Sequence, residues 1–240
     1  TYLDSGDATW GLMATGAVNN QYTGAGVSVA VLDSGLDVSH PDFASIRLVD
    51  DVSLASGSPQ GDGNGHGTHC AGTVVGPLQP SGAPTYGVAR NVDLYVGKVV
   101  DDHGKGSMRQ VIAGIAWAVS RGCRLVSVSL GAAINVPSAT FEQAARRALD
   151  AGTLVIAPAG NNANREQSQP GFVIRPGNSR SVLAVGAVDR NLQLANFSSR
   201  SSVIDGGEVD LVAPGVEVFS SWTGPSNYRV LSGTSMAVPY

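Results

Sequence analysis

Short apolar runs alternate along this chain with segments whose apolar residues recur at helical spacing. Runs rich in β-branched and other apolar residues predict strands over residues 27–32, 93–100, 125–130, 153–157 and 182–188. The segments between them predict helices over residues 66–75, 107–120 and 140–150. Strands that alternate with helices through short connections indicate an α/β fold, a doubly wound and mostly parallel sheet with helices on both faces.

The size of the chain sets a limit on how many domains it can form. With 240 residues, of which 42% are hydrophobic and 14% charged, the chain has ample material for one large core. Residues 216–222 and 228–232 predict an antiparallel pair around the turn Thr223-Gly224-Pro225. Because no internal repeat or change of composition marks a boundary, we expect a single domain over residues 1–240.

Charge, apolar runs and cysteines exclude several classes of protein. The net charge of −4 and the lack of a basic run give no support for a nucleic-acid partner. No apolar stretch approaches membrane-spanning length, so no membrane partner is expected, and the first residues lack a signal-peptide pattern. The two cysteines, Cys70 and Cys123, argue against a disulfide scaffold and leave a single bridge open without supporting it.

Three glycine-flanked segments supply an acid, an imidazole and a hydroxyl. Asp33 ends a predicted strand in Val-Leu-Asp-Ser-Gly, His66 lies in Gly-His-Gly-Thr-His, and Ser235 lies in Gly-Thr-Ser-Met-Ala. A serine hydroxyl is a poor nucleophile at neutral pH unless a base takes its proton and a carboxylate orients that base. These three residues meet that need, and sites in doubly wound folds form beyond the carboxyl ends of the strands.

Each of these residues also has a plainer interpretation. Asp33 suits an ordinary turn, Ser235 suits a helix cap, and His66 suits a structural histidine or a metal ligand paired with His69. A metal pair on a helix normally has its histidines four residues apart and a third ligand nearby, whereas these two are three residues apart. The complete set therefore favours nucleophilic catalysis.

In these segments the chain resembles the subtilisin-like serine proteases, or subtilases, and most closely their proteinase K branch. A fourth segment, Ala159-Gly160-Asn161-Asn162, is similar to the oxyanion-hole segment of the family, and weaker similarity extends from Trp10 to the last residue. The resemblance implies a serine endopeptidase that acts through an acyl-enzyme and needs no cofactor for the chemistry.

The resemblance also implies a role for each residue of the set. Ser235 would attack the scissile carbonyl, His66 would move the proton, and Asp33 would orient His66. The side chain of Asn161 and the backbone N–H of Ser235 would stabilise the negative oxygen of the tetrahedral intermediate.

The same resemblance implies where a polypeptide substrate binds. Gly104, Lys105 and Gly106 would form one backbone edge that pairs with the extended substrate, and Ser129, Leu130 and Gly131 would form the other. One wall of the main side-chain pocket would consist of Ala157, Pro158, Ala159 and Gly160, with Ile174 and Arg175 near the floor. Pro158 stands where relatives usually have a small residue, which alters the expected shape of this pocket.

A structural Ca²⁺ is a further implication of the resemblance. The carboxylate of Asp210 would hold it with the backbone carbonyls of Arg180 and Val182, since hard oxygen ligands suit this ion. An ordinary surface aspartate explains Asp210 equally well. Residues 76–85 contain three prolines and no asparagine, so no calcium site is assigned there. Cys70 would be a buried free thiol near the histidine, as in the proteinase K branch, and Cys123 a core residue.

The sequence stops at Tyr240, five residues beyond Ser235, where relatives continue through a long helix and usually have a histidine. We therefore expect C-terminal elements of the fold to be missing from this chain, and hypothesise that a second polypeptide or a continuation completes it. The resemblance implies a secreted or extracytoplasmic protein whose further partners are a propeptide or a protein inhibitor.

Two rival functions stay open on the sequence alone. The same three residues would serve a peptide maturase or cyclase, in which an amine rather than water accepts the acyl group. The chain would alternatively be a non-catalytic fragment that needs a C-terminal partner.

Overall fold

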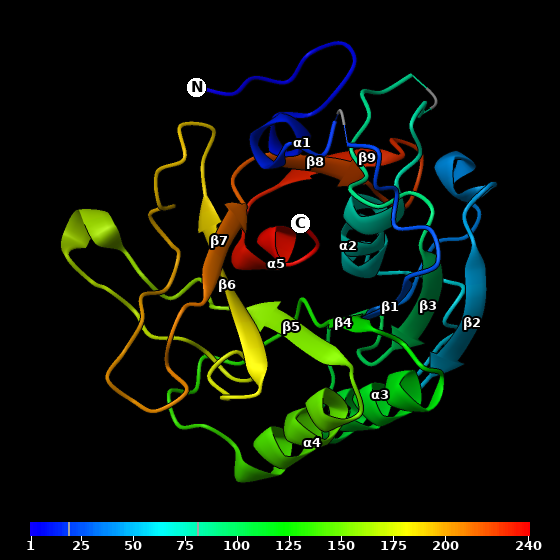
Figure 1. Ribbon diagram of the computed structural model, residues 1–240. Coiled ribbons are helices and arrows are strands. Elements are labelled where there is room, and N and C mark those ends of the chain that lie inside the picture. The colour runs from blue at the N-terminus through cyan, green and yellow to red at the C-terminus, as the bar shows by residue number, and fades with distance from the viewer. Residues whose placement is uncertain (19, 81) are drawn as a thin grey trace.

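The computed structural model describes residues 1–18, 20–80 and 82–240, and these form an α/β architecture (Figure 1). In this described part, the main sheet has seven strands in the order β2-β3-β1-β4-β5-β6-β7, and each neighbouring pair is parallel. The doubly wound parallel sheet predicted from the sequence is confirmed. Its strands are β1 (Ser28–Asp33), β2 (Leu48–Ser53), β3 (Asp93–Lys98), β4 (Leu125–Ser127), β5 (Leu154–Pro158), β6 (Val182–Val188) and β7 (Leu211–Pro214).

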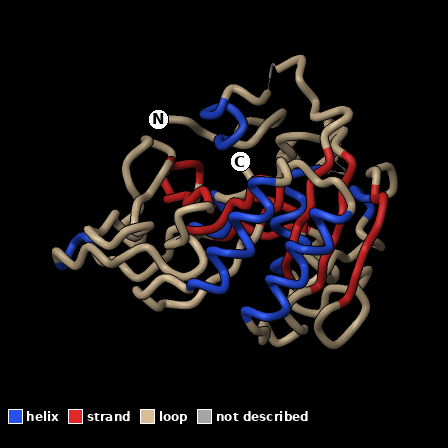
Figure 2. The backbone as a smooth tube through the Cα atoms, turned by 60° about the horizontal axis from the view of Figure 1, so that its bottom comes forward, coloured by secondary structure: helices blue, strands red, loops and turns tan. Residues whose placement is uncertain are grey.

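Helices cover both faces of the sheet, as expected. Figure 1 shows α3 (Met108–Ser120) and α4 (Ala139–Asp150) on one face, with α2 (His66–Val75) and α5 (Thr234–Ala237) on the other. Figure 2 shows the layer of helices in front of the strands. The remaining helices are α1 (Trp10–Thr15) and two short 3₁₀ segments, Pro41–Phe43 and Arg165–Gln167.

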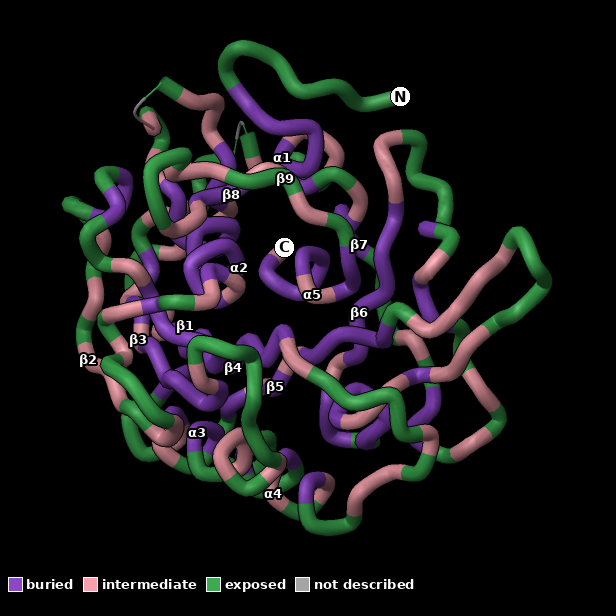
Figure 3. Tube along the Cα trace, turned by 180° about the vertical axis from the view of Figure 1, so that it is seen from behind, coloured by how far each residue is buried: buried purple, intermediate pink, exposed green. Residues whose placement is uncertain are grey.

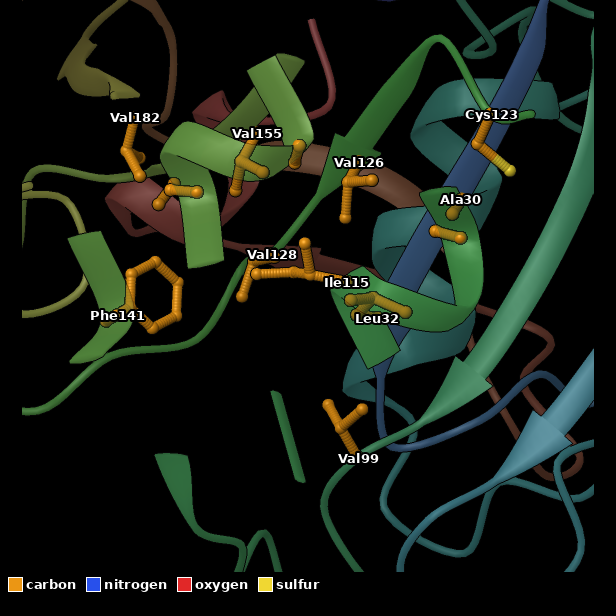
Figure 4. Close-up of a cluster of buried hydrophobic side chains, with 14 residues drawn as sticks. Ala30, Leu32, Val99, Ile115, Cys123, Val126, Val128, Phe141, Val155 and Val182 are labelled. Carbon is orange, nitrogen blue, oxygen red and sulfur yellow. The ribbon is translucent and has the colours of Figure 1, made fainter. Parts of the chain in front are cut away.

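Strand β1 shows how one apolar run serves both faces. Ala30 and Leu32 belong to the core beneath α3 and α4, where Figure 4 shows them near Ile115. Val29 and Val31 belong to the core beneath α2. Successive side chains of a strand point to opposite faces, so a strand covered on both sides needs a continuous apolar run. Each fully buried valine or leucine contributes about 1.5–3 kcal/mol to folding.

The buried residues are concentrated in the central strands and in α2 and α5, while the loops and the N-terminal segment are exposed (Figure 3). No helix in the described ranges combines the length and the apolar composition that a bilayer-spanning helix requires.

The helices begin and end close to the predicted residues. Helix α2 spans 66–75 as predicted. Helix α3 begins one residue later than predicted, because Ser107 is its N-cap: the Ser107 hydroxyl accepts from Gln110 N–H, and the Gln110 side chain accepts from Ser107 N–H. Helix α4 begins at Ala139, one residue earlier than predicted, after the N-cap Ser138.

Strand β4 is shorter than the predicted 125–130, and the reason bears on function. The strand ends at Ser127. Beyond it, Val128 N–H still donates to Ile156 O, but the carbonyl of Ser129 accepts from the Ser235 hydroxyl instead of a neighbouring strand. The apolar residues after Ser127 therefore leave the sheet and become part of the candidate site.

The predicted antiparallel pair is confirmed as β8 (Val218–Ser221) and β9 (Tyr228–Leu231). Strands β2 and β7 were not predicted from the sequence. Both lie at the edges of the main sheet, where each strand has one neighbour; no residue of β2 is buried, and β7 is exposed at its first two residues and buried at its last two. The pattern of β2 is weak because polar residues interrupt it, and β7 is only four residues long.

Candidate active site

The side chains of Asp33 and His66 meet where β1 ends and α2 begins. Nδ1 of His66 lies 2.8 Å from Oδ1 and 2.9 Å from Oδ2 of Asp33, which is buried. The carboxylate also accepts from the backbone N–H of Ser34 at 2.8 Å. Because the carboxylate holds Nδ1 as a proton donor, the free nitrogen Nε2 is the one that can accept a proton.

The turn that presents His66 is organised by the buried carboxylate of Asp62. Oδ1 accepts from Asn64 N–H and Gly65 N–H, and Oδ2 accepts from Thr68 N–H at 2.8 Å and the Thr68 hydroxyl at 2.7 Å. These bonds satisfy backbone donors in the first turn of α2, which have no partner within the helix. Sequence reasoning assigned no role to Asp62, although an aspartate just before a helix signals such a cap.

Lys98 is fully buried and joins three segments of the site. Its ammonium donates to the carbonyl of Ser34, next to Asp33, and to Oδ1 of Asp102 at 2.6 Å. The same carboxylate oxygen accepts from Gly63 N–H, and the hydrogen bond from Lys98 is the main cause that lowers the pKa of Asp102. A buried ammonium requires such partners. Lys98 and Asp102 thereby connect the turn that follows Asp33 to the turn that precedes His66.

Opposing effects set the pKa of His66. Burial disfavours the imidazolium and lowers the pKa, while the charge of Asp33 and its hydrogen bonds favour the imidazolium and raise it. The outcome is a pKa well above the ordinary 6.5. Sγ of Cys70 lies 3.8 Å from Nδ1 of His66, but burial raises the pKa of Cys70, so it is a neutral thiol at neutral pH. Asp33 is therefore the group that stabilises the imidazolium.

Ser235 lies in the single turn of α5, and Cys70 contacts both this turn and the His66 ring. Sγ of Cys70 lies 3.8 Å from the carbonyl oxygen of Ser235 and the same distance from Nδ1 of His66. The Ser235 hydroxyl donates to the carbonyl of Ser129 at 2.8 Å, and no hydrogen bond joins it to His66 within the described residues. Proton transfer to His66 therefore requires the hydroxyl to give up its bond to Ser129, and catalytic hydrogen bonds often form only with substrate present.

Asn161 is held by Thr234 in one orientation. Its Oδ1 accepts from the backbone N–H and from the hydroxyl of Thr234, both at 2.9 Å. A backbone N–H can only donate, so the atom that faces it is the oxygen, and Nδ2 is directed away from Thr234. Nδ2 lies on the side of Gly233, 3.4 Å from the position that a Cβ there would occupy. The amide thus presents a proton donor beside Ser235.

The predicted substrate edges line the two sides of a cavity of about 190 Å³. Gly104 and Gly106 lie on one side, and Leu130 and Gly131 on the other. Lys105 does not line the cavity, since its backbone N–H donates to the Asp101 carboxylate within its own loop. An exposed backbone edge is what an extended peptide needs in order to pair as an added strand.

Ile174 fills the space between the predicted pocket wall and one substrate edge. A Cβ at Gly131 or at Gly160 would lie 2.5 Å from the Ile174 side chain, and Ile174 N–H donates to the carbonyl of Ala159. Ala157 and Pro158 end β5 and lead into this wall. Sequence reasoning placed Ile174 near a pocket floor. The structure places it against both glycines.

The two cysteines are free and buried on opposite faces of the sheet. Cys70 belongs to the core beneath α2, and Cys123 to the core beneath α3 and α4. The bridge that the sequence left open does not form, because the sheet separates the two thiols.

The alternative of a metal held by His66 and His69 finds no support in the geometry. Nε2 of His69 lies 3.2 Å from the carbonyls of Val218 and Arg229, and burial is the main cause that lowers the pKa of His69 to about 4. Among the described residues, the one group of three metal-ligating side chains is Asp33, His66 and Cys70, which are the site's own groups.

The surroundings of Asp210 partly fit the predicted calcium site. The residue lies beside β6, where its N–H donates to Ala184 O and its Oδ2 accepts from Ala184 N–H at 2.7 Å. In the described part of the chain, the other carboxylate oxygen and the carbonyl of Arg180 have no hydrogen-bond partner. Such oxygens suit Ca²⁺. Asp210 offers one free oxygen rather than two.

The sequence is similar to a known protein family and to several known proteins. The model of the subtilase family matches residues 24–240. The alkaline protease of Alkalihalobacillus alcalophilus is 41% identical over 235 residues, which cover 96% of this chain and 57% of the relative. Subtilisin Savinase of Lederbergia lenta is 40% identical over 235 residues, which cover 96% of this chain and 80% of the relative.

Among solved structures, Sphericase matches with a TM-score of 0.80 and 31% sequence identity, over 96% of this chain and 80% of that chain. The chain thus spans four fifths of that structure but little more than half of the first relative.

Proposed function

This chain belongs to the subtilase family, and we propose that it is a serine endopeptidase that hydrolyses peptide bonds through an acyl-enzyme. The observation that carries the proposal is that both carboxylate oxygens of Asp33 lie within hydrogen-bonding distance of Nδ1 of His66, near Ser235. Neither rival, acyl transfer to an amine or a non-catalytic fragment, has support in the comparisons.

In the first half of the proposed reaction, Oγ of Ser235 attacks the carbonyl carbon of the scissile bond and its proton passes to Nε2 of His66. The C–N bond then breaks, the leaving amine takes the proton from His66, and the acyl group stays on Ser235 as an ester. Asp33 remains ionised and stabilises the imidazolium.

In the second half, water attacks the ester while His66 accepts a proton from the water. The C–O bond to Ser235 breaks, His66 returns the proton to Oγ, and the carboxylic acid leaves. During both attacks, Nδ2 of Asn161 and the backbone N–H of Ser235 would donate to the negative oxygen. One such donor is worth about 10²–10³ in turnover.

We further propose that residues 104–106 and 129–131 pair with the substrate backbone, and that residues 157–160 line the main pocket. A propeptide or a protein inhibitor would occupy the same edges. Residues 1–240 would belong to a single peptidase domain, with Asp210 and the carbonyls of Arg180 and Val182 as a structural Ca²⁺ site. When bound, this ion would supply no chemistry to the reaction.

Two finer proposals rest on resemblance. Nearer kinship to proteinase K is supported by Cys70, which is buried 3.8 Å from Nδ1 of His66. An extracellular location is proposed from the family resemblance.

A fluorophosphonate probe tests the proposed function, because it reacts with a serine only where a base activates the hydroxyl. The wild-type protein and a Ser235→Ala variant are labelled in parallel, and the label is located by peptide mass. Labelling at Ser235 alone, lost in the variant, is the expected result. Folded protein that takes no label would contradict the proposal.

A further inference from the structure

The cavity between the two substrate edges has apolar walls and one charged residue. Met108, Val111, Leu130 and Phe141 supply apolar surface, and Arg175 is the charged residue among the described lining residues. Its volume of about 190 Å³ is large enough for one amino-acid side chain. A cation at the boundary of an apolar cavity favours an occupant with an apolar body and a negative end.

The guanidinium of Arg175 has unused hydrogen-bonding capacity. Nε and Nη2 donate to the carbonyl of Val136, with Nε at 3.1 Å. A guanidinium has more N–H donors than one carbonyl can take. In the described part of the chain, no carboxylate lies within 4.0 Å of it. Several other arginines do have a carboxylate partner: Arg47, Arg121, Arg146, Arg180 and Arg190.

The backbone holds Arg175 directly beside a substrate edge. Ala132 N–H donates to Arg175 O at 2.8 Å, and Arg175 N–H donates to Ala132 O at 3.2 Å. Gly131, the preceding residue of the edge, has no backbone hydrogen bond within the described residues and is free to pair with a peptide. A bound substrate would therefore run alongside the segment to which Arg175 is paired.

The same geometry indicates which substrate residue would reach the cavity. The Ser129 carbonyl accepts from the Ser235 hydroxyl, so Ser129 marks the position of the scissile bond. Gly131, which lines the cavity, lies two residues further along the edge. Because alternate side chains of an extended peptide share a face, the side chain that enters belongs to a residue about two to four positions from the scissile bond.

We propose that Arg175 makes this cavity select an acidic side chain of the substrate, glutamate in particular. The inference rests on the proposed function and adds the substrate class to it. The methylene groups of glutamate would pack on the apolar walls, and its carboxylate would accept charge-assisted hydrogen bonds from the free guanidinium donors. Glutamine has the same shape without the charge, and lysine has the opposite charge.

The test uses peptides that differ only by Glu, Gln or Lys at one position, taken in turn on both sides of the scissile bond. At a single position, we expect kcat/KM to be about fivefold higher for the Glu peptide than for the Gln peptide. This Glu/Gln ratio should fall as salt is added. Arg175→Met abolishes this ratio, whereas Arg175→Lys retains part of it. Arg146→Gln is the matched control, because it removes one exposed positive charge on α4 and leaves the ratio unchanged.

Equal ratios in the wild type and in Arg175→Met would overturn the proposal, as would the absence of any Glu preference. Should Arg175→Met fail to fold, the salt dependence of the wild-type ratio decides, since a preference without charge does not respond to salt. Peptide binding to Ser235→Ala is measured in parallel by fluorescence anisotropy. A Glu preference in binding without cleavage by the wild type would support the cavity and contradict the proposed activity, which keeps the two failures distinct.

Discussion

The carboxylates of Asp33 and Asp62 lie in a buried network of paired donors, whereas two groups near Ser235 keep unpaired donors in the described part of the chain. The carboxylate of Asp62 takes several donors of the His66 turn, and Lys98 joins that turn to the one that follows Asp33. Around Ser235, by contrast, Nδ2 of Asn161 and the backbone of Gly131 are unpaired in the described residues.

The difference matches what the two parts of the site must do in the proposed reaction, the acid–base pair of Asp33 and His66 on one side and the nucleophile with the substrate edges on the other. The acid–base half keeps one geometry throughout a reaction, so saturating its hydrogen bonds in advance costs nothing at the moment of proton transfer. The nucleophile and its neighbours must instead bind a substrate: Ser235 gives up one hydrogen bond, to the Ser129 carbonyl, while the unpaired groups at Asn161 and Gly131 have none to break. Four predictions test this contrast, from the largest expected effect to the smallest.

Replacing the orienting acid should have the largest effect. Asp33→Asn keeps the shape but lets the amide stabilise the wrong imidazole tautomer, so kcat should fall by about 10⁴. Steady-state kinetics on a peptide substrate measures this, with the near-ultraviolet circular dichroism spectrum as the control for folding. A loss of tenfold or less would show that the pairing with His66 is not needed for catalysis.

Replacing the unpaired amide should have the next largest effect and should spare binding. Asn161→Ala removes one donor to the developing oxyanion, so kcat should fall by about 10²–10³ with KM little changed. The same substitution at the neighbouring Asn162, whose amide is engaged with Phe172 backbone groups, serves as the comparison. Equal losses of kcat in the two variants would contradict the role of Asn161.

Replacing the buried lysine should affect stability more than any exposed ion pair does. Lys98→Met removes an ammonium that bonds Ser34 O and Asp102, and Asp102 is partly solvated and can recover its hydration. We expect a loss of about 1–3 kcal/mol in the free energy of unfolding, measured by urea denaturation. Arg146→Met breaks an exposed pair and should cost about 0.5 kcal/mol or less. A similar cost for both variants would remove the contrast.

The smallest effect is a displaced pH profile. Because the pKa of His66 is raised well above 6.5, kcat/KM should increase with pH through a midpoint above 6.5, as the base loses its proton. The stability has the opposite dependence: a raised folded-state pKa stabilises the fold below 6.5, and this contribution is lost as pH rises through the folded-state pKa. Residual activity of Asp33→Asn should have a lower midpoint. An unchanged midpoint would show that Asp33 does not set this pKa.

Local pattern was sufficient for much of the fold. The continuous apolar run of β1 predicted a strand covered on both faces and placed Asp33 at its carboxyl end. Helix α2 was predicted from His66 to Val75 and has those bounds. The edge strands β2 and β7 were not predicted, because polar residues interrupt β2 and β7 is only four residues long. The predicted strand over residues 125–130 proved too long: β4 ends at Ser127, and the carbonyl of Ser129 accepts from the distant Ser235 hydroxyl.

The sequence by itself predicted the order of the central strands and their helices and pointed to Asp33, His66 and Ser235 as the candidate acid, imidazole and hydroxyl, because periodicity and motif are local properties of the chain. Only the tertiary structure decided that the Ser235 hydroxyl bonds to Ser129, that Lys98 joins the turns around the acid, and that Arg175 is among the residues that line an apolar cavity. Each of these contacts joins residues that are distant along the chain, and the packing of whole elements, not local pattern, brings such residues together.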